Sequence, residues 1–310
     1  MAARDRGHPG DPGVTGAESR RARVVRRGAL SVVATPIGNL ADLSRRAAEV
    51  LSSAGAVCCE DTRHTGRLLE LAGVPAPRLL ALHAHNEVEQ IGVVLRLLAA
   101  GTPVALVCDA GTPVISDPGG RLVAAVIDAG FDVTAVPGPS AALSALVVSG
   151  FDVNRFRFEG FLPRRGGERR SRLGQIAASP CPTVVFEAPG RVAKTLADLA
   201  EAAGPDRRVV VARELTKLHE EVYRGRVDEA VARASEREPR GEHVLVVDAA
   251  PNRRPPSAVE TRLAIGRLVA AGVGLRDATT AVEVLLDVAH RDAYEAALEI
   301  RAADADSKAL

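Results

Sequence analysis

Short apolar runs alternate with longer amphipathic stretches from residue 30 onward. The apolar runs span 30–34, 56–60, 79–82, 103–108 and 132–136. The amphipathic stretches span 40–53, 64–72, 87–100, 118–129 and 139–148. Strands that alternate with helices of about 10–15 residues are typical of an α/β domain with a largely parallel sheet. The run 104–108 is apolar throughout, as expected for a strand that helices cover on both faces.

This rhythm breaks between residues 150 and 161, and an Arg- and Gly-rich segment follows at 163–170. A second α/β series then begins, with helices predicted at 168–178, 190–203 and 227–237, strands at 183–187, 208–213 and 243–248, and a hairpin across 215–224. We therefore place a boundary between an N-terminal α/β domain, 29–150, and a C-terminal α/β domain, 151–250.

The two ends of the chain differ from these domains. Residues 1–28 contain seven Arg and five Gly with almost no apolar residues, which predicts a disordered, mildly basic tail. A Pro-Pro pair closes the segment 252–256, which reads as a linker. Residues 257–310 show only helical patterning, so a small extension of two or three helices is expected.

Composition narrows the class of protein. A chain of 310 residues with 46% hydrophobic and 25% charged residues is globular and long enough for two domains. The net charge of +1 means that contact with a nucleic acid would need a local basic patch. Aromatic residues make up 3%, which argues against an RNA reader built on stacked rings. The four cysteines lie in apolar runs without paired spacing, and we expect a reducing, cytoplasmic environment and no membrane span.

Loops of small residues follow three of the predicted strands. The sequence T-P-I-G-N follows the first at 35–39, D-A-G-T-P-V-I-S-D-P-G follows the fourth at 109–119, and P-G-P-S-A follows the fifth at 137–141. Ligands of open α/β sheets bind at the carboxyl ends of the strands. Three such loops would form a bed of backbone N–H and C=O groups suited to a flat nucleoside. The spacing of a dinucleotide motif and the lysine of a P-loop are both missing, so a triphosphate ligand is not predicted.

Two positions in these loops have structural interpretations of their own. Gly38 either adopts a positive φ in a strand-to-helix turn or allows the backbone to pass close to a neighbouring group. Asp117 followed by Pro118 is the residue pair of a helix N-cap and first helical position, which predicts a helix start there.

Polar side chains follow the second and third strands. Glu60 and Asp61 lie at the end of the second, where one carboxylate is expected to reach the cleft because neighbouring side chains of a strand face opposite ways. The alternative is that they cap a helix N-terminus. His83 and His85 lie two residues apart without a further matched cluster, so contacts to a substrate are favoured over a metal site.

Basic residues end the strands of the second domain. Arg191, Arg213 and Lys217, together with the arginines of 164–170, would form a basic rim that neutralises phosphates. Taken singly, each is more typical of a solvated charge or an ion-pair partner.

Seven segments in unbroken order give these loops a family resemblance. They are 33–40, 60–65, 83–87, 109–119, 137–141, 159–163 and 213–217. Through them the chain, over about residues 29–250, resembles the bacterial methyltransferases that modify a cytidine ribose in 16S ribosomal RNA, members of the tetrapyrrole methylase superfamily. Residues 257–310 are similar to that family's helical extension only in length and helicity.

The resemblance implies two α/β domains with S-adenosylmethionine in the cleft between them, in a homodimer. It implies 2′-O-methylation of cytidine 1402 in the small ribosomal subunit. The cofactor-binding residues carried over by motif are Ile37, Gly38, Asp109, Ala110, Gly111, Thr112, Ile115, Ser116, Ser140, Ala141, Glu187 and Leu215. Many of these contacts would be made by the main chain, which explains why small residues can serve.

The same resemblance implies the catalytic groups. A ribose hydroxyl is a poor nucleophile at neutral pH, so in-line placement and a carboxylate base would accelerate its attack on a sulfonium methyl group. Our hypothesis is that Glu60 or Asp61 is the base. The residues expected to contact RNA are Arg63, His64, His85, Asn86, Arg191, Arg213 and Lys217.

Two alternatives remain at this point. A tetrapyrrole C-methyltransferase has the same fold, but its first loop is expected to read more like G-x-G-P-G-D than the T-P-I-G-N found here. A ribosome-binding module without turnover would lack tight binding of S-adenosylmethionine.

Overall fold

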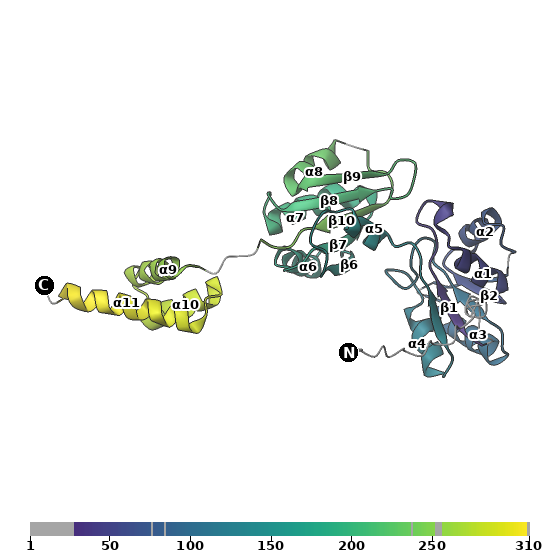
Figure 1. The fold of residues 1–310 in the computed structure, drawn as a ribbon, viewed down its shortest axis with the longest axis horizontal. Helices are drawn as coiled ribbons and strands as arrows, with labels where there is room; N and C mark the ends of the chain where they lie inside the picture. Colours follow the sequence, from purple (N-terminus) through teal and green to yellow (C-terminus); the bar gives the residue numbers. More distant parts are fainter. Residues whose placement is uncertain (1–27, 76, 84, 237, 252–255, 309–310) are drawn as a thin grey trace, which may run out of the picture. The chain divides into compact units, whose positions relative to one another are not determined.

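The computed structural model describes residues 28–75, 77–83, 85–236, 238–251 and 256–308. The chain forms two compact units that divide between Ala250 and Pro251 (Figure 1). Almost all of the predicted N-terminal tail and of the predicted linker lies outside the described residues.

The first sheet of the larger unit is parallel throughout, as predicted. Its strands are β1 (Leu30–Val33), β2 (Ala56–Cys59), β3 (Arg78–Ala81), β4 (Val104–Leu106) and β5 (Val133–Val136). They lie in the order β3-β2-β4-β1-β5. The chain moves outward on one side of β1 to form β2 and β3, and returns through β4 to reach β5 on the other side. The connections after β1 and after β4 therefore run to opposite sides, and the strand order reverses between these two neighbouring strands.

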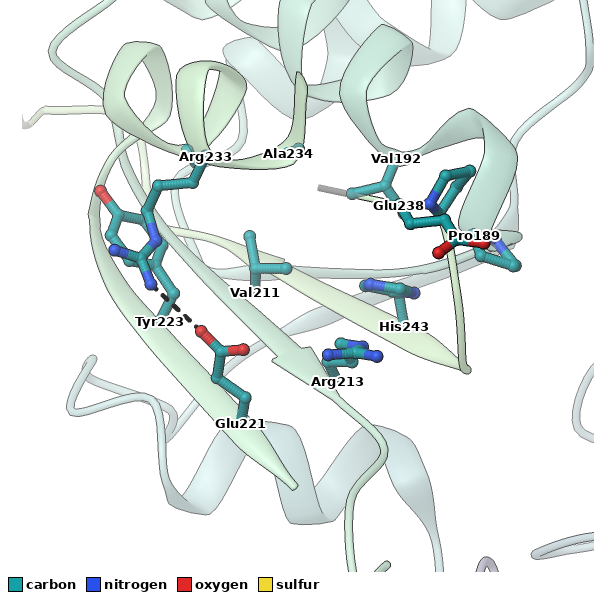
Figure 2. A pocket seen from close by; sticks show the side chains of 12 residues that line it. Pro189, Val192, Val211, Arg213, Glu221, Tyr223, Arg233, Ala234, Glu238 and His243 are labelled. Atoms are coloured by element: carbon teal, nitrogen blue, oxygen red, sulfur yellow. Dashed lines mark hydrogen bonds and ion pairs between the residues drawn. The ribbon is translucent and has the colours of Figure 1, made fainter. Parts of the chain in front are cut away.

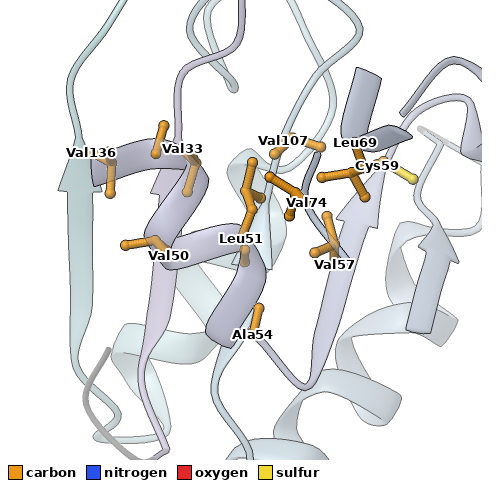
Figure 3. Close-up of a cluster of buried hydrophobic side chains, with 12 residues drawn as sticks. Val33, Val50, Leu51, Ala54, Val57, Cys59, Leu69, Val74, Val107 and Val136 are labelled. Atoms are coloured by element: carbon orange, nitrogen blue, oxygen red, sulfur yellow. The ribbon is translucent and has the colours of Figure 1, made fainter. Parts of the chain in front are cut away.

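Helices cover both faces of this sheet. They are α1 (Arg45–Ser53), α2 (Thr62–Leu71), α3 (Glu87–Ala99) and α4 (Gly120–Asp128). Alternate residues of β2 enter different cores: Val57 and Cys59 pack in the cluster that α1 and α2 cover, and Cys58 packs in the cluster that α3 and α4 cover. Figure 3 shows the first of these clusters, with Leu51 against the strands. Burial on both faces explains why the central strands β2 and β4 are apolar throughout.

Two predicted helix starts are wrong. Residues 40–42 form a separate 3-10 turn, η1 (Leu40–Asp42), and α1 begins after Ser44, whose hydroxyl accepts from the Ala47 N–H. The N-cap of α4 is Gly119, in a left-handed conformation, and not Asp117. The expectation failed because the capping carboxylate comes from another helix: Glu87 Oε1 accepts from the Arg121 and Leu122 N–H groups at 2.9 and 3.1 Å. This arrangement leaves Asp117 available for another role.

The second sheet is mixed. Its strands are β6 (Arg157–Phe161), β7 (Thr183–Glu187), β8 (Arg208–Arg213), β9 (Glu221–Arg226) and β10 (His243–Val247), in the order β6-β7-β10-β8-β9. Only β6 and β7 run parallel. The hairpin predicted across 215–224 is wider than expected: its strands are β8 and β9, which pair antiparallel on either side of the loop 214–220. The sequence reading missed β6, whose pairing is interrupted by a bulge between Phe158 and Gly160.

Helices also cover both faces of the second sheet. On one face lie α6 (Gly167–Ala177), α7 (Val192–Ala203), which follows the 3-10 turn η2 (Pro189–Arg191), and α8 (Val227–Ser235). The other face is covered by α5 (Ala141–Val147), which follows β5 of the first sheet yet packs on β7 and β10. Ile37, from the loop after β1, joins the same cluster. Apolar packing thus fixes the loops of the first sheet against the second.

The smaller unit contains α9 (Ala258–Ala270), α10 (Leu275–Leu286) and α11 (His290–Lys308). Ser257 and Glu260 form a capping box at the start of α9. Ile265, Ala278, Val282 and Ala293 belong to its core. The fold is the predicted one, two α/β sheets with a helical extension. No helix within the described residues has the length and apolarity needed to span a membrane.

Candidate active site

The candidate site begins at the ends of β1 and β4, where the strand order of the first sheet reverses. The loops after β1 and β4 are joined there by a two-way backbone bridge, in which the Thr35 N–H donates to the Gly111 carbonyl at 2.8 Å and the Gly111 N–H donates back at 3.1 Å. The Thr35 hydroxyl donates to the Cys108 carbonyl at 3.1 Å. Open α/β sheets bind ligands at the point where the strand order reverses in this way.

Gly38 shows why the loop after β1 needs a residue without a side chain. It does not have a positive φ. A Cβ atom added there would lie 2.3 Å from Lys217 Cγ, 2.9 Å from Thr216 Oγ1 and 3.1 Å from the Leu215 carbonyl oxygen. Of the two interpretations of Gly38, close approach is therefore confirmed, and the neighbour is the loop after β8.

A cavity of about 360 Å³ lies between the loops of the two sheets. We call it the interlobe cavity. Its volume falls in the range of small-molecule sites. Of the predicted cofactor-binding residues it is lined by Ile37, Asp109, Ala110, Gly111, Thr112, Ile115, Ser116, Ser140, Ala141 and Glu187. Gly38 and Leu215 do not line it but form the adjacent contact between the loops.

Residues of the second sheet complete this lining, and the sequence reading missed most of them. They are Phe161, Phe186, Ala188, Pro189, Glu242, His243 and Val244. The two phenylalanine rings meet edge to face with centroids 5.7 Å apart. A signal was present, since each of these residues lies at a strand end of the second series, but without the mixed strand order the sequence does not show which ends face the first sheet.

Glu187 is the most constrained group of the interlobe cavity. Its carboxylate is fully buried, accepts from the Ala188 N–H at 2.9 Å and from the Thr195 hydroxyl at 2.6 Å, and lies 3.2 Å from Arg191 Nε. The Thr195 oxygen in turn accepts from Arg169 Nη2 at 2.9 Å. These bonds hold the end of β7 in place and compensate for burying the charge.

The lining of the interlobe cavity is acidic. It contains four carboxylates and no Lys or Arg among the described residues. The one imidazole of this lining belongs to His243. Burial and the nearby Arg213 charge lower its pKa, which favours the neutral form. Glu187 and Glu242 have cationic partners, whereas Asp109 accepts from the backbone N–H of Asp61 at 3.1 Å. Within the described residues, the negative charge of this lining that no ion pair compensates therefore lies on Asp109 and Asp117.

A second cavity, of about 480 Å³, adjoins the first. We call it the adjoining cavity, and it is lined by Glu60, His83, Glu87, Ser116, Asp117, Pro118, Gly119, Gly120 and Arg121. Glu60, one of the two predicted bases, therefore reaches this cavity and not the interlobe cavity. Asp117, which was predicted from the sequence only as a helix cap, lines both cavities.

Asp61 has the structural role that the sequence left open as an alternative. It is the N-cap of α2: its Oδ1 accepts from the Arg63 N–H at 2.8 Å and from the His64 N–H at 3.4 Å. Its Oδ2 pairs with Arg63 Nη2 at 3.0 Å. The side-chain and backbone hydrogen bonds from Arg63 lower the pKa of Asp61 to about 2. A carboxylate this acidic and this occupied is a weak proton acceptor.

The predicted RNA contacts from the first sheet lie beside these cavities without lining them. Arg63 is engaged by Asp61, and His64 is exposed in the first turn of α2. His85 stacks on His83, with ring centroids 5.2 Å apart. The Asn86 amide is used within its own loop, accepting from the His83 N–H at 2.7 Å and donating to the Ala81 carbonyl at 3.0 Å.

The predicted contacts from the second sheet also have protein partners. Arg191 donates to the Leu162 carbonyl at 2.8 Å, and Lys217 lies 2.8 Å from Glu214 and 3.0 Å from Glu242. Arg213 donates to the Arg240 carbonyl at 3.1 Å.

Arg213 also lines a separate small pocket, shown in Figure 2. There Arg233 pairs with Glu221 at 3.1 Å and lies 4.9 Å from the Tyr223 ring centroid. The Glu221 carboxylate and the Tyr223 ring therefore compensate the charge of Arg233 within the pocket.

Within the described residues, no group of three or more His, Cys, Asp or Glu side chains could hold a metal ion. Cys58, Cys59 and Cys108 are buried free thiols, and burial raises the pKa of Cys58 to about 12.

Comparison with known proteins places this geometry in a family. Residues 29–231 match the model of the Tetrapyrrole (Corrin/Porphyrin) Methylases. Among solved structures, a cobalt-precorrin-4 methyltransferase of cobalamin biosynthesis is similar with a TM-score of 0.55 and 18% identity, covering 76% of this chain and 98% of that one. A uroporphyrin-III C-methyltransferase from Thermus thermophilus in complex with S-adenosylhomocysteine has a TM-score of 0.51 and 21% identity, covering 71% and 96%. These likenesses establish the fold.

Closer relatives carry one common name, ribosomal RNA small subunit methyltransferase I. The protein of Xylella fastidiosa strain Temecula1 is 48% identical over 237 residues, 76% of this chain and 86% of that protein. The protein of Synechocystis is 40% identical over 277 residues, 89% and 99%. That of Mycobacterium tuberculosis strain H37Rv is 41% identical over 276 residues, 88% and 96%. The chain therefore belongs to the tetrapyrrole methylase family and, within it, to the ribosomal RNA small subunit methyltransferases I.

Proposed function

We propose that this protein transfers the methyl group of S-adenosylmethionine to the ribose 2′-hydroxyl of cytidine 1402 in 16S ribosomal RNA. The observation that carries the methyltransferase activity and its ribosomal RNA substrate is the 40–48% identity to relatives of that name over most of the chain. The choice of nucleotide and atom is what the resemblance carried by the seven motifs implies.

The volume of the interlobe cavity and its carboxylates suit S-adenosylmethionine. Gly111, at φ +87, forms part of its wall, where a Cβ atom would lie 3.3 Å from Ile37 Cγ2. Backbone groups of the loops after β4 and β5 supply hydrogen-bond partners for an adenosyl group and a methionine carboxylate. The excess of carboxylates suits the sulfonium, which supplies an electrophilic methyl group when the ligand is bound. We assign the predicted lining residues to this ligand.

Binding of RNA requires cationic side chains that are free to pair with phosphates. Such side chains lie in α6 and in the loop before it. Arg164, Arg165 and Arg170 are exposed and make no ion pair within the described residues. They border a groove of about 520 Å³ together with Lys194. Buried Arg169 anchors this surface, pairing with Asp198 at 2.7 Å. We propose that the three exposed arginines contact the RNA backbone, with Arg63 and His64 nearer the target nucleotide.

We also propose a cytoplasmic homodimer. The family resemblance implies the dimer, and α5 presents Val147 and Leu143, which are 75% and 53% exposed, as candidate contacts. The free cysteines fit a reducing compartment. Sedimentation equilibrium checks the oligomeric state: a single monomer mass at micromolar concentration would contradict the dimer.

Methyl transfer to small subunits tests the proposed function. Purified protein is incubated with methyl-labelled S-adenosylmethionine and with 30S subunits that lack ribose methylation, and the labelled nucleotide is mapped. We expect one label, on the ribose of cytidine 1402. Label on a base, or on another nucleotide, would overturn the proposed atom or site, and no transfer beside a family member that is active in the same assay would overturn the activity.

The same assay weighs the two alternatives. A C-methyltransferase would label uroporphyrinogen and leave the subunits unlabelled, and the solved C-methyltransferases resemble this chain at only 18–23% identity. A binding module without turnover would label neither substrate.

A further inference from the structure

The two cavities meet at two residues. Within the described part of the chain, Ser116 and Asp117 are the residues that line both the interlobe cavity and the adjoining cavity. Group transfer requires donor and acceptor to meet at contact distance, so the reacting atoms must lie at such a junction. Resting on the ribose methylation proposed above, we propose that the target nucleotide binds in the adjoining cavity and that Asp117 accepts the proton of its 2′-hydroxyl.

The other nearby carboxylates are less well placed. Asp61 is occupied as the cap of α2 and by its ion pair with Arg63. Glu60 lines only the adjoining cavity, and Asp109 lines only the interlobe cavity. Asp117 alone among these carboxylates borders the space where a methyl group could pass from one cavity to the other.

The loop that carries Asp117 is held in an unusual conformation. Val114 and Ser116 have positive φ angles of 76° and 69°, and a β-branched residue rarely adopts that region. Gly119 closes the loop at φ 119°, packed so tightly that a Cβ there would lie 2.8 Å from Leu106 Cδ2. Such strain persists only where the surroundings impose it, and it clusters at functional sites.

A buried carboxylate from another helix fixes the far side of this loop. Glu87 is 6% exposed and accepts from the N–H groups of Arg121 and Leu122 in the first turn of α4, four and five residues after Asp117. The Asp117 side chain therefore projects from a segment tied down at both ends. Preorganisation of this kind is what an in-line attack requires.

The charges around Asp117 suit a proton acceptor. Burial, with Glu60 and Asp109 beside it, raises its pKa to about 6, although the Cys108 thiol acts in the opposite direction. His83, Glu87 and Arg121 are the remaining titratable or charged groups that line the adjoining cavity. A base is most effective when its pKa lies near the working pH.

The proposed step balances without any further reactant. The ribose oxygen forms a bond to the methyl carbon while the carbon–sulfur bond breaks, and sulfur keeps the electron pair as a neutral thioether. The hydroxyl proton passes to the Asp117 carboxylate, which releases it to solvent through the open adjoining cavity.

Asp117→Asn tests this role, with Asp128→Asn, at the end of the helix that follows the Asp117 loop, as the control. We expect kcat to fall at least a hundredfold in Asp117→Asn, with the Kd for S-adenosylmethionine and the KM for 30S subunits within threefold of wild type. Asp128 lies at the end of α4, away from both cavities, and its variant should keep wild-type kcat.

Three further readouts separate catalysis from structure. For wild type, kcat should fall tenfold per pH unit below about 6, and this dependence should vanish in the residual activity of Asp117→Asn. Asp117→Asn should melt no lower than wild type at pH 8, since it removes a charge from an unfavourable environment. Asp117→Glu should recover part of kcat.

The inference is overturned if Asp117→Asn keeps kcat within fivefold of wild type. It is equally overturned if the loss of activity comes with a lower melting temperature or weaker binding of S-adenosylmethionine. Both results presuppose a wild-type protein that labels a ribose. If the wild type does not, the proposed function fails first, and the mapping experiment shows that separately.

Discussion

The hydroxyl of Thr195 links two buried charges, and removing it should be costly. It donates to Glu187 Oε2 at 2.6 Å and accepts from Arg169 Nη2 at 2.9 Å. In Thr195→Val both bonds are lost while the shape is nearly kept. Hydrogen bonds to charged groups contribute roughly 1.5–3 kcal/mol each. Because Arg169 and Glu187 keep other partners, we take the lower value for each bond and expect the free energy of unfolding to fall by about 3 kcal/mol.

A matched variant is expected to change the free energy of unfolding in the opposite direction. Thr183 is 1% exposed in β7, and its hydroxyl has no hydrogen-bond partner within the described residues. Thr183→Val makes the same chemical change but removes an unsatisfied group, so the fold should gain up to about 1 kcal/mol.

Calorimetry of the full chain measures both variants. For a unit of this size about 3 kcal/mol lowers Tm by roughly 6–12 °C. Thr195→Val should show that drop in the transition of the larger unit, with weaker binding of S-adenosylmethionine because Glu187 is less restrained. A loss below about 1 kcal/mol, or an equal loss in Thr183→Val, would refute the view that the Thr195 network holds the end of β7.

The remaining predictions concern other contacts. Gly38→Ala should weaken the binding of S-adenosylmethionine at least tenfold in calorimetric titration, because its Cβ displaces the loop after β8, whereas Gly190→Ala, which has open space, should not. Replacing Arg164, Arg165 and Arg170 by Gln should lower the salt dependence of RNA binding, in log–log slope, by about 2–3. The ion-paired Arg45, Arg67 and Arg226, replaced together, should change that slope far less. Asp61→Asn should melt below wild type at pH 5, and the gap should close as the pH falls through about 2, because the stability contributed by a carboxylate of lowered pKa is lost on protonation. A gap unchanged by pH would contradict that charge effect.

The hydrophobic pattern was enough to predict the first sheet. Its central strands β2 and β4 are buried on both faces, so alternation of apolar runs with amphipathic helices was a direct signal. The second sheet was harder to predict. Strand β6 carries a bulge and exposed residues such as Phe158 and Phe161, which blur its periodicity.

The candidate site was predictable as a set of loops but not as a set of roles. Small residues at the carboxyl ends of β1, β4 and β5 predicted the part of the interlobe cavity that the first sheet lines. The role of Asp117 was hidden because the group that caps α4 is Glu87, more than thirty residues away in sequence. Local capping rules cannot anticipate such a tertiary contact.

The charges were the least predictable part. Arg191, Arg213 and Lys217 lie at strand ends as expected, but each is engaged by carbonyl or carboxylate groups brought in by the fold. Sequence shows which cations exist, and only the structure shows which ones still lack a partner.

A crystal structure of the protein with S-adenosylhomocysteine would show whether the interlobe cavity is the cofactor site. We expect the bound nucleoside thioether to occupy the interlobe cavity, in contact with Gly111 on one side and the end of β7 on the other, with its sulfur facing the junction at Asp117. Density for the ligand at another place, or an interlobe cavity left vacant at saturating ligand, would contradict it.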